Sequence, residues 1–185
     1  MSGSRAIDLN VKNLMIEKMI IKRRTGWLLA LGLALIGALA ILAPVPLAFA
    51  PALQLTTLTG QTLTLSDWRG KPVIVTFWAT DCAGCIKEIP PLRGLYQDYH
   101  ARGLEMLAIA MYYDPPSHVV AMTGEQQLPY PVALDLTAAS ARAFGQVALT
   151  PTTFLIAPDG RIALQYTGLF DEQAIRAALD RFLKG

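Results

Sequence analysis

The sequence predicts one α/β domain, a mixed sheet with helices on both sides, preceded by an apolar N-terminal segment. Three observations support this prediction. The 185 residues are 53% hydrophobic with a mean hydropathy of +0.38, and the excess is local because Thr25–Ala50 contains no charged residue. About 135 residues follow, enough for one domain but not for two. In that part, strand and helix patterns alternate and end in a hairpin, as in mixed sheets that begin with βαβ units.

The composition also excludes several classes of protein. Val, Ile, Leu and Phe recur in short runs after residue 50, which excludes disorder. There is no internal period and there are two cysteines, which excludes repeat folds and disulfide frameworks. The first 24 residues hold six of the sixteen Lys and Arg residues, so residues 51–185 carry a net charge near −2. Because these residues show no clustered basic face, we expect no nucleic-acid partner.

The basic N-terminus predicts export of the domain. Lys22-Arg23-Arg24 stands directly before the apolar stretch, which indicates a cytoplasmic N-terminus. We expect a cytoplasmic basic tail over residues 1–24, a signal anchor over 25–50 and the exported domain over 51–185. Met19 opens a more ordinary pre-sequence, so the alternative is that translation starts there.

The apolar stretch itself allows two outcomes. Its seventeen residues, Trp27–Ala43, reach about 26 Å as a helix, near the short end of a membrane span. Ala48-Phe49-Ala50 has the small-x-small form of a signal-peptidase site, but Pro51 would follow the cut. An uncleaved single-pass anchor is therefore favoured over a removed signal.

The first elements of the domain follow from local patterns. Apolar and polar residues alternate on both sides of Thr59-Gly60, which predicts a hairpin. The run Pro72–Ala79 (PVIVTFWA) is β-branched and aromatic almost throughout, as in strands buried on both faces, so we expect it at the centre of the sheet. The helix that follows is expected to bend at Pro90-Pro91 and to end at Gly103.

The second half of the domain adds buried strands, a hairpin and a final helix. A second apolar run predicts another buried strand. Pro158-Asp159-Gly160 predicts the turn of the hairpin, and Asp171 and Glu172 stand at the positive end of an amphipathic helix. The expected elements are the hairpin strands Leu53–Leu58 and Gln61–Leu65, the helical turn Ser66–Gly70, strand Pro72–Ala79, helix Ala83–Arg102, strand Leu104–Met111, helix His118–Gln127, strand Pro131–Leu134, helix Ala138–Phe144, strands Thr152–Ala157 and Arg161–Gly168, and helix Asp171–Leu183.

The two cysteines lie in Cys82-Ala83-Gly84-Cys85, where the central strand gives way to a helix. At a helix N-terminus the unpaired N–H groups and the macrodipole favour an anion, so the thiol nearest the end ionises more easily. We therefore predict that Cys82 is the nucleophile. Cys85 lies one helical turn further, close enough to attack a mixed disulfide on Cys82.

Other uses of the two cysteines are less favoured. A structural disulfide between residues three apart would constrain the unfolded chain little. A zinc site needs four ligands, and His100 and His118 lie far from the pair without ligand spacing. Covalent haem attachment needs His where Ile86 stands. Copper handling through two soft thiolates remains open.

The stretch Val75–Pro90 (VTFWATDCAGCIKEIP) resembles the active-site sequence of the TlpA/ResA-like, membrane-tethered thioredoxin-fold proteins. The later stretch Thr150–Ile156 (TPTTFLI), with Asp159-Gly160-Arg161, is similar to the second signature of that family. The resemblance covers Leu53 to the C-terminus and implies a thioredoxin-like fold. It further implies a cis Thr150–Pro151 bond facing the cysteines and a backbone at Thr150 that pairs with the substrate strand.

Several positions depart from the family pattern. Asp81 stands where many relatives have Trp; either it caps the helix or its charge opposes the Cys82 thiolate, and both make the couple more reducing. Gly84 replaces the usual proline, which loosens the turn. Thr76 stands where thioredoxin has a buried aspartate, so a proton carrier must lie elsewhere.

Besides Asp81, two further carboxylates and one tryptophan are candidate modulators of the cysteine pair. Glu88 follows Cys85 by three residues and is either a modulator or a surface residue of the helix. Asp114 stands roughly where ResA-like relatives place an active-site acid, with an ordinary loop carboxylate as the alternative. Trp78 is expected in the core and to border the cysteine pair, and Tyr112–Pro116 is expected as a rigid loop able to contact a partner.

The sequence therefore predicts an enzyme, an exported thiol-disulfide oxidoreductase that reduces protein disulfides. The expected localisation is the inner membrane, single-pass, with the domain in the periplasm or otherwise outside the cytoplasmic membrane. We expect no cofactor beyond the Cys82–Cys85 disulfide and no metal. The resemblance implies a membrane electron-donor protein and substrates in cytochrome c biogenesis or copper-site assembly. A disulfide-donating oxidase and a Cu(I)-binding module stay open as alternatives.

Overall fold

A computed structural model describes residues 48–184 of the chain. The predicted basic tail and the predicted apolar segment up to residue 47 lie outside the described residues. Across residues 48–184, none of the helices has both the length and the apolar character needed to cross a bilayer.

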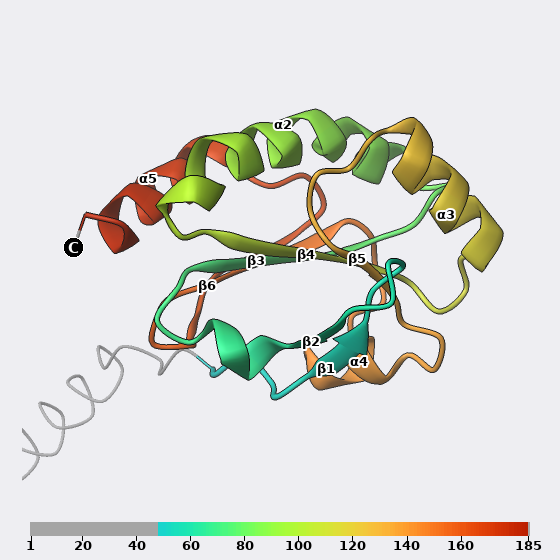
Figure 1. The fold of residues 1–185 in the computed structure, drawn as a ribbon, viewed down its shortest axis with the longest axis horizontal. Coiled ribbons are helices and arrows are strands. Elements are labelled where there is room, and N and C mark those ends of the chain that lie inside the picture. Colours follow the sequence, from blue (N-terminus) through green and yellow to red (C-terminus); the bar gives the residue numbers. More distant parts are fainter. Residues whose placement is uncertain (1–47, 185) are drawn as a thin grey trace, which may run out of the picture. The chain divides into compact units, whose positions relative to one another are not determined.

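The domain is built on a five-stranded mixed sheet with the strand order β5-β4-β3-β6-β7 (Figure 1). Strands β3, β4 and β5 are parallel, whereas β6 pairs antiparallel with both β3 and β7. The sheet therefore begins with parallel βαβ units and ends in a hairpin, as the sequence predicts. The strands are β3 (Val73–Trp78), β4 (Glu105–Ala110), β5 (Val132–Leu134), β6 (Thr152–Ile156) and β7 (Ile162–Thr167).

Helices cover both faces of this sheet. Helices α2 (Ala83–Tyr99), α3 (Pro116–Glu125) and α5 (Glu172–Phe182) lie on one face, at the top of Figure 1. The opposite face carries the 3-10 turn η1 (Leu65–Trp68) and α4 (Ala139–Ala143), together with strands β1 (Gln54–Thr56) and β2 (Thr62–Thr64). A second 3-10 turn, η2 (His100–Arg102), replaces the last turn predicted for α2. Gly103 follows with φ 115°, a left-handed conformation that suits glycine.

Strand β3 shows why the core has two layers. All six of its residues are buried. Ile74 and Trp78 pack into the core under α2 and α5, whereas Val75 and Phe77 pack into the core on the other face. Phe77 is the centre of an aromatic contact with Phe144 and Phe154. A strand that is apolar on both faces can lie only between two packed layers, which confirms its central place in the sheet.

The segment before β1 pairs with the domain. Phe49 forms a bridge with Arg161, and the Ala50 N–H donates to the Gly160 carbonyl at 2.9 Å. The sequence places residues 48–50 at the end of the apolar segment, yet in the structure they extend the edge of the sheet beside β7. Strands β1 and β2 pair antiparallel, and Leu58 N–H donates to Val132 beside the other edge.

Candidate redox site

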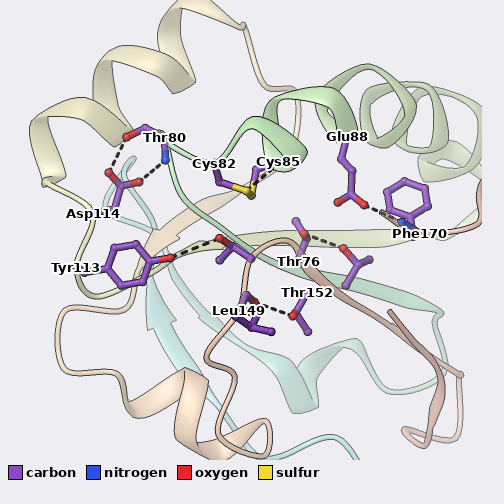
Figure 2. Close-up of a disulfide and its surroundings, with 12 residues drawn as sticks. Thr76, Thr80, Cys82, Cys85, Glu88, Tyr113, Asp114, Leu149, Thr152 and Phe170 are labelled. Atoms are coloured by element: carbon purple, nitrogen blue, oxygen red, sulfur yellow. Dashed lines mark hydrogen bonds between the residues drawn. A yellow bond between two sulfur atoms is a disulfide. The ribbon is translucent and has the colours of Figure 1, made fainter. Parts of the chain in front are cut away.

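Cys82 and Cys85 form a disulfide at the start of helix α2 (Figure 2). Cys82 is the N-cap residue, and its Sγ accepts the Cys85 N–H at 3.1 Å. A helix-capping role for Asp81, one of the two expected from the sequence, is wrong because the Cys82 sulfur caps the helix. Cys82 is partly exposed, whereas Cys85 is only 3% exposed. One sulfur is therefore accessible to a partner and the other is shielded behind it.

The loop before β6 lies against this turn. The Thr150–Pro151 peptide is cis, as the resemblance implies. A Cβ added at Gly84 would lie 3.0 Å from Cδ of Pro151 and 4.0 Å from Sγ of Cys82. Glycine at position 84 therefore lets the buried proline ring approach the cysteine pair. The Thr152 hydroxyl donates to the Leu149 carbonyl at 2.8 Å, which closes the loop.

Glu88 is buried beneath the cysteine pair and is not a surface residue. It is 3% exposed, and one carboxylate oxygen accepts the Phe170 N–H at 2.8 Å (Figure 2). Burial raises the pKa of Glu88 from 4.5 to about 7, although the Phe170 N–H and the nearby Thr153 hydroxyl partly offset this effect. The group can therefore gain or lose a proton near neutral pH.

A small cavity connects Glu88 with Cys85. Its volume is about 10 Å³, and Trp78, Thr76 and Tyr130 also line it. Trp78 Nε1 and Oε2 of Glu88 are buried polar atoms without a hydrogen-bond partner. A space of this size fits about one water molecule between polar partners. Trp78 thus borders the cysteine pair from the core side, as expected.

Asp114 is also buried but differs from Glu88 in its contacts. It is 6% exposed, and its two oxygens accept the Thr80 N–H at 2.7 Å and the Thr80 hydroxyl at 2.6 Å (Figure 2). Its neighbour Tyr113 places its hydroxyl 3.4 Å from Oγ1 of Thr150. Asp114 therefore lies at the site, where it holds the backbone two residues before Cys82.

The structure brings together nearly all of the residues that the sequence singles out. Cys82, Cys85 and Pro151 meet at one end of the sheet, with Glu88 and Trp78 beneath them. Asp81 is exposed beside Cys82. Among the described residues no cluster of His, Cys, Asp and Glu is arranged to hold a metal ion. The arrangement can carry out thiol-disulfide exchange, with one accessible sulfur and a titratable carboxyl beside the buried one.

Two contacts of the site have no sequence signal. The Thr80–Asp114 bonds join residues 34 apart, and the Tyr113–Thr150 contact joins residues 37 apart. The burial of Glu88 could be inferred from the sequence. Cys85 is expected to face the site, and Glu88, three residues later, lies on the same face of the helix.

Comparison with known proteins identifies relatives of the same chemistry. The family model described as Redoxin matches residues 47–179. The thiol-disulfide oxidoreductase ResA of Geobacillus thermodenitrificans is 34% identical over 131 residues, which cover 71% of this chain and 74% of that protein. ResA of Bacillus subtilis is 32% identical over 126 residues, 68% of this chain and 69% of that protein.

Solved structures agree. A Neisseria meningitidis protein described as a thioredoxin superposes with a TM-score of 0.68 at 32% identity, covering 74% of this chain and 90% of that one. A Chlorobium tepidum protein described as thiol:disulfide interchange protein DsbE has a TM-score of 0.68 at 28% identity, covering 74% and 96% of the two chains. The central mixed sheet with flanking helices is therefore a thioredoxin-like fold.

Proposed function

Because the chain belongs to the Redoxin family and is a thiol-disulfide oxidoreductase of the ResA and DsbE type, we propose that it reduces protein disulfides outside the cytoplasmic membrane, with Cys82 as nucleophile and Cys85 as resolving thiol. The observation that carries the proposal is the difference in environment between the two sulfurs. Cys82 is partly exposed at the helix N-terminus, whereas Cys85 is buried beside Glu88.

In the reduced protein, Cys82 makes the first attack. Its sulfur lies at the N-cap of α2, where the Cys85 N–H and the helix dipole stabilise a thiolate. The thiolate attacks one sulfur of the substrate disulfide, a Cys82–substrate bond forms, and the other substrate sulfur leaves as a thiolate. The backbone of Thr150, next to Pro151, pairs with the substrate strand and orients its disulfide.

Cys85 completes the reaction. Its thiol gives its proton to the Glu88 carboxylate, directly or through one water in the shared cavity, and the resulting thiolate attacks Sγ of Cys82. The Cys82–Cys85 disulfide forms, and the second substrate sulfur leaves as a thiolate. Two electrons pass from the protein to the substrate. A pKa of about 7 suits Glu88 to accept and return this proton near neutral pH.

Asp81 supports electron flow from this protein to its substrate. Its exposed carboxylate stands directly before Cys82, and a negative charge there disfavours the thiolate. A less stable reduced form makes the couple more reducing, which favours a reductase over an oxidase.

The cellular setting rests on the sequence and on family resemblance. The apolar segment before the domain would act as a single-pass anchor in the inner membrane, with the domain in the periplasm or its equivalent. Since such a compartment is oxidising, regeneration requires a membrane protein that delivers reducing equivalents. Substrates would be protein disulfides of apocytochrome c or of a copper site. No cofactor beyond the cysteine pair is needed for this reaction.

Single-cysteine variants and one redox titration test the proposal. Cys82→Ser should abolish insulin reduction, whereas Cys85→Ser should accumulate a mixed disulfide with the substrate. Trapping by Cys82→Ser alone would reverse the two roles. We expect a reduction potential below about −180 mV, and a value near about −120 mV would indicate a disulfide donor. Tight Cu(I) binding with little insulin reduction would instead indicate a copper-binding module.

A further inference from the structure

The loop between β4 and α3 contacts both halves of the redox site. Asp114 accepts two short hydrogen bonds from Thr80, two residues before Cys82. Its neighbour Tyr113 is 47% exposed and reaches Thr150, the residue before Pro151. Figure 2 shows these two side chains directed to opposite partners, one toward the cysteine turn and one toward the proline loop.

The loop is itself held firmly at the end of β4. The Met111 N–H donates to the Trp78 carbonyl, and the Asp114 N–H donates to the Met111 carbonyl, both at 3.0 Å. The rings of Tyr112 and Tyr113 pack edge to face with centroids 5.4 Å apart. A loop fixed in this way transmits the position of one neighbour to the other.

From this geometry we infer that Tyr113-Asp114 is a positioning element, which sets the gap between the Cys82 sulfur and the Thr150-Pro151 edge. The inference rests on the proposed function, because a substrate strand that pairs with Thr150 must also present its disulfide to Cys82. Asp114 acts through Thr80 and does not exchange protons with the cysteines.

The two contacts differ in strength. The two bonds to Asp114 are short, at 2.7 and 2.6 Å, so they carry most of the positioning. The Tyr113–Thr150 contact is long for a hydroxyl pair at 3.4 Å, so its contribution is smaller. Under the proposed function, the exposed Tyr113 ring lies beside the substrate strand that pairs with Thr150.

The decisive comparison is Asp114→Asn against Asp114→Ala. Asparagine keeps the shape and can accept the Thr80 N–H and donate to its hydroxyl, whereas alanine removes both bonds. For exchange with a protein disulfide, we expect Asn to stay within about threefold of wild type and Ala to lose about tenfold or more in kcat/KM. With a small-molecule disulfide, which does not pair with Thr150, Ala should lose less. If Asn loses as much as Ala on both substrates, the carboxylate acts by its charge or its proton and the inference is wrong.

Alkylation of Cys82 in the reduced protein gives a readout that needs no substrate. Thr80 holds the turn that carries Cys82. Asp114→Ala should therefore change the alkylation rate by more than about threefold, whereas Asp114→Asn should match wild type. This comparison stands even if the protein proves not to be a reductase. Equal rates in all three proteins would contradict the inference.

Two further variants test the inference in case Asp114→Ala fails to fold. Thr80→Val removes one of the two bonds from the other side and should give an intermediate loss. Tyr113→Phe removes only the hydroxyl contact with Thr150. If the loop acts as one element, the combined Tyr113→Phe and Asp114→Ala effects on the protein substrate should not add. Fully additive effects would separate the two residues and reject a single element.

Discussion

The two ends of the central sheet differ in how far their charged side chains are buried. At the end where β3 and β4 finish, several carboxylates are buried and several large apolar side chains are exposed. The three buried carboxylates of residues 48–184, Glu88, Asp114 and Asp135, all lie there. At the end where β3 and β4 begin, charges are exposed and paired, as in Lys71–Glu105 at 2.6 Å and Arg161–Asp159 at 3.5 Å.

Exposed apolar side chains follow the same division. Eight large apolar residues are exposed in the described part of the chain, and six of them lie in segments at the redox end. These six are Ile86, Tyr112, Tyr113, Leu136, Leu149 and Leu169. The buried Glu88 carboxylate and the exposed apolar groups both reduce stability, so the redox end departs from stable packing where function requires it.

Among the variants that test this comparison, Glu88→Gln has the largest expected effect. Burial raises the pKa of Glu88 from 4.5 to about 7, so the folded protein keeps a proton that the unfolded chain releases between these values. Wild-type stability therefore falls as the pH rises from 4.5 to 7, by up to about 3 kcal/mol. Gln keeps the bond from Phe170 and has no proton to lose. We expect the variant to be more stable than wild type at pH 8 and equal at pH 4, in urea denaturation of the oxidised protein.

The same substitution should slow turnover. A carboxyl that accepts the Cys85 proton contributes about 100-fold or more as a general base, so stability and activity should move in opposite directions. Glu125→Gln, at an exposed position of α3, is the matched control and should change neither. A stability difference between Glu88→Gln and wild type that is the same at pH 5 and pH 8 would contradict the buried-carboxyl argument.

A second, smaller test compares two glycines of helix α2. An alanine Cβ at Gly84 would lie 3.0 Å from the Pro151 ring, which is too close without movement. Gly84→Ala should destabilise the oxidised protein by about 1 kcal/mol and lower the exchange rate. At Gly94 the nearest atom is Nη2 of Arg176, 3.6 Å away. Gly94→Ala should stabilise the helix by about 0.5–1 kcal/mol with unchanged activity. Similar effects at both positions would show that Gly84 has no special role.

Most of the fold could be predicted because burial on both faces leaves a strong pattern. The expected strand Pro72–Ala79 exceeds β3 by one residue at each end. Helix α3 begins at Pro116, two residues before the predicted start, because proline is favourable in the first turn, where its missing N–H is not needed. The first hairpin is shorter than predicted, with three residues in each strand, because Thr57 forms a bridge with Ala133 of β5 and Leu65 begins the η1 turn.

For the redox site, the residues that could be predicted differ from those that could not in whether their role follows from residue type and local geometry. Cys82, Cys85 and Pro151 could be located because their chemistry depends on residue type and local geometry. The Asp81 cap could not be judged from sequence, since a thiol and a carboxylate compete for the same N–H groups. The partners of Asp114 depend on a loop folding back over the end of β3, which no local pattern records.

The smallest expected effect lies at the opposite end of the sheet, at the Lys71–Glu105 ion pair. The Lys71 side chain is 49% exposed and that of Glu105 is 17% exposed, so water screens the attraction. Lys71→Met should change the free energy of unfolding by less than about 1 kcal/mol, measured by urea denaturation, and leave disulfide exchange unchanged. Losing the positive partner is tolerated there because Glu105 still reaches solvent, whereas the buried carboxylates of the redox end do not. A loss of activity in Lys71→Met would mean that the two ends of the sheet are coupled, and the functional division between them would no longer hold.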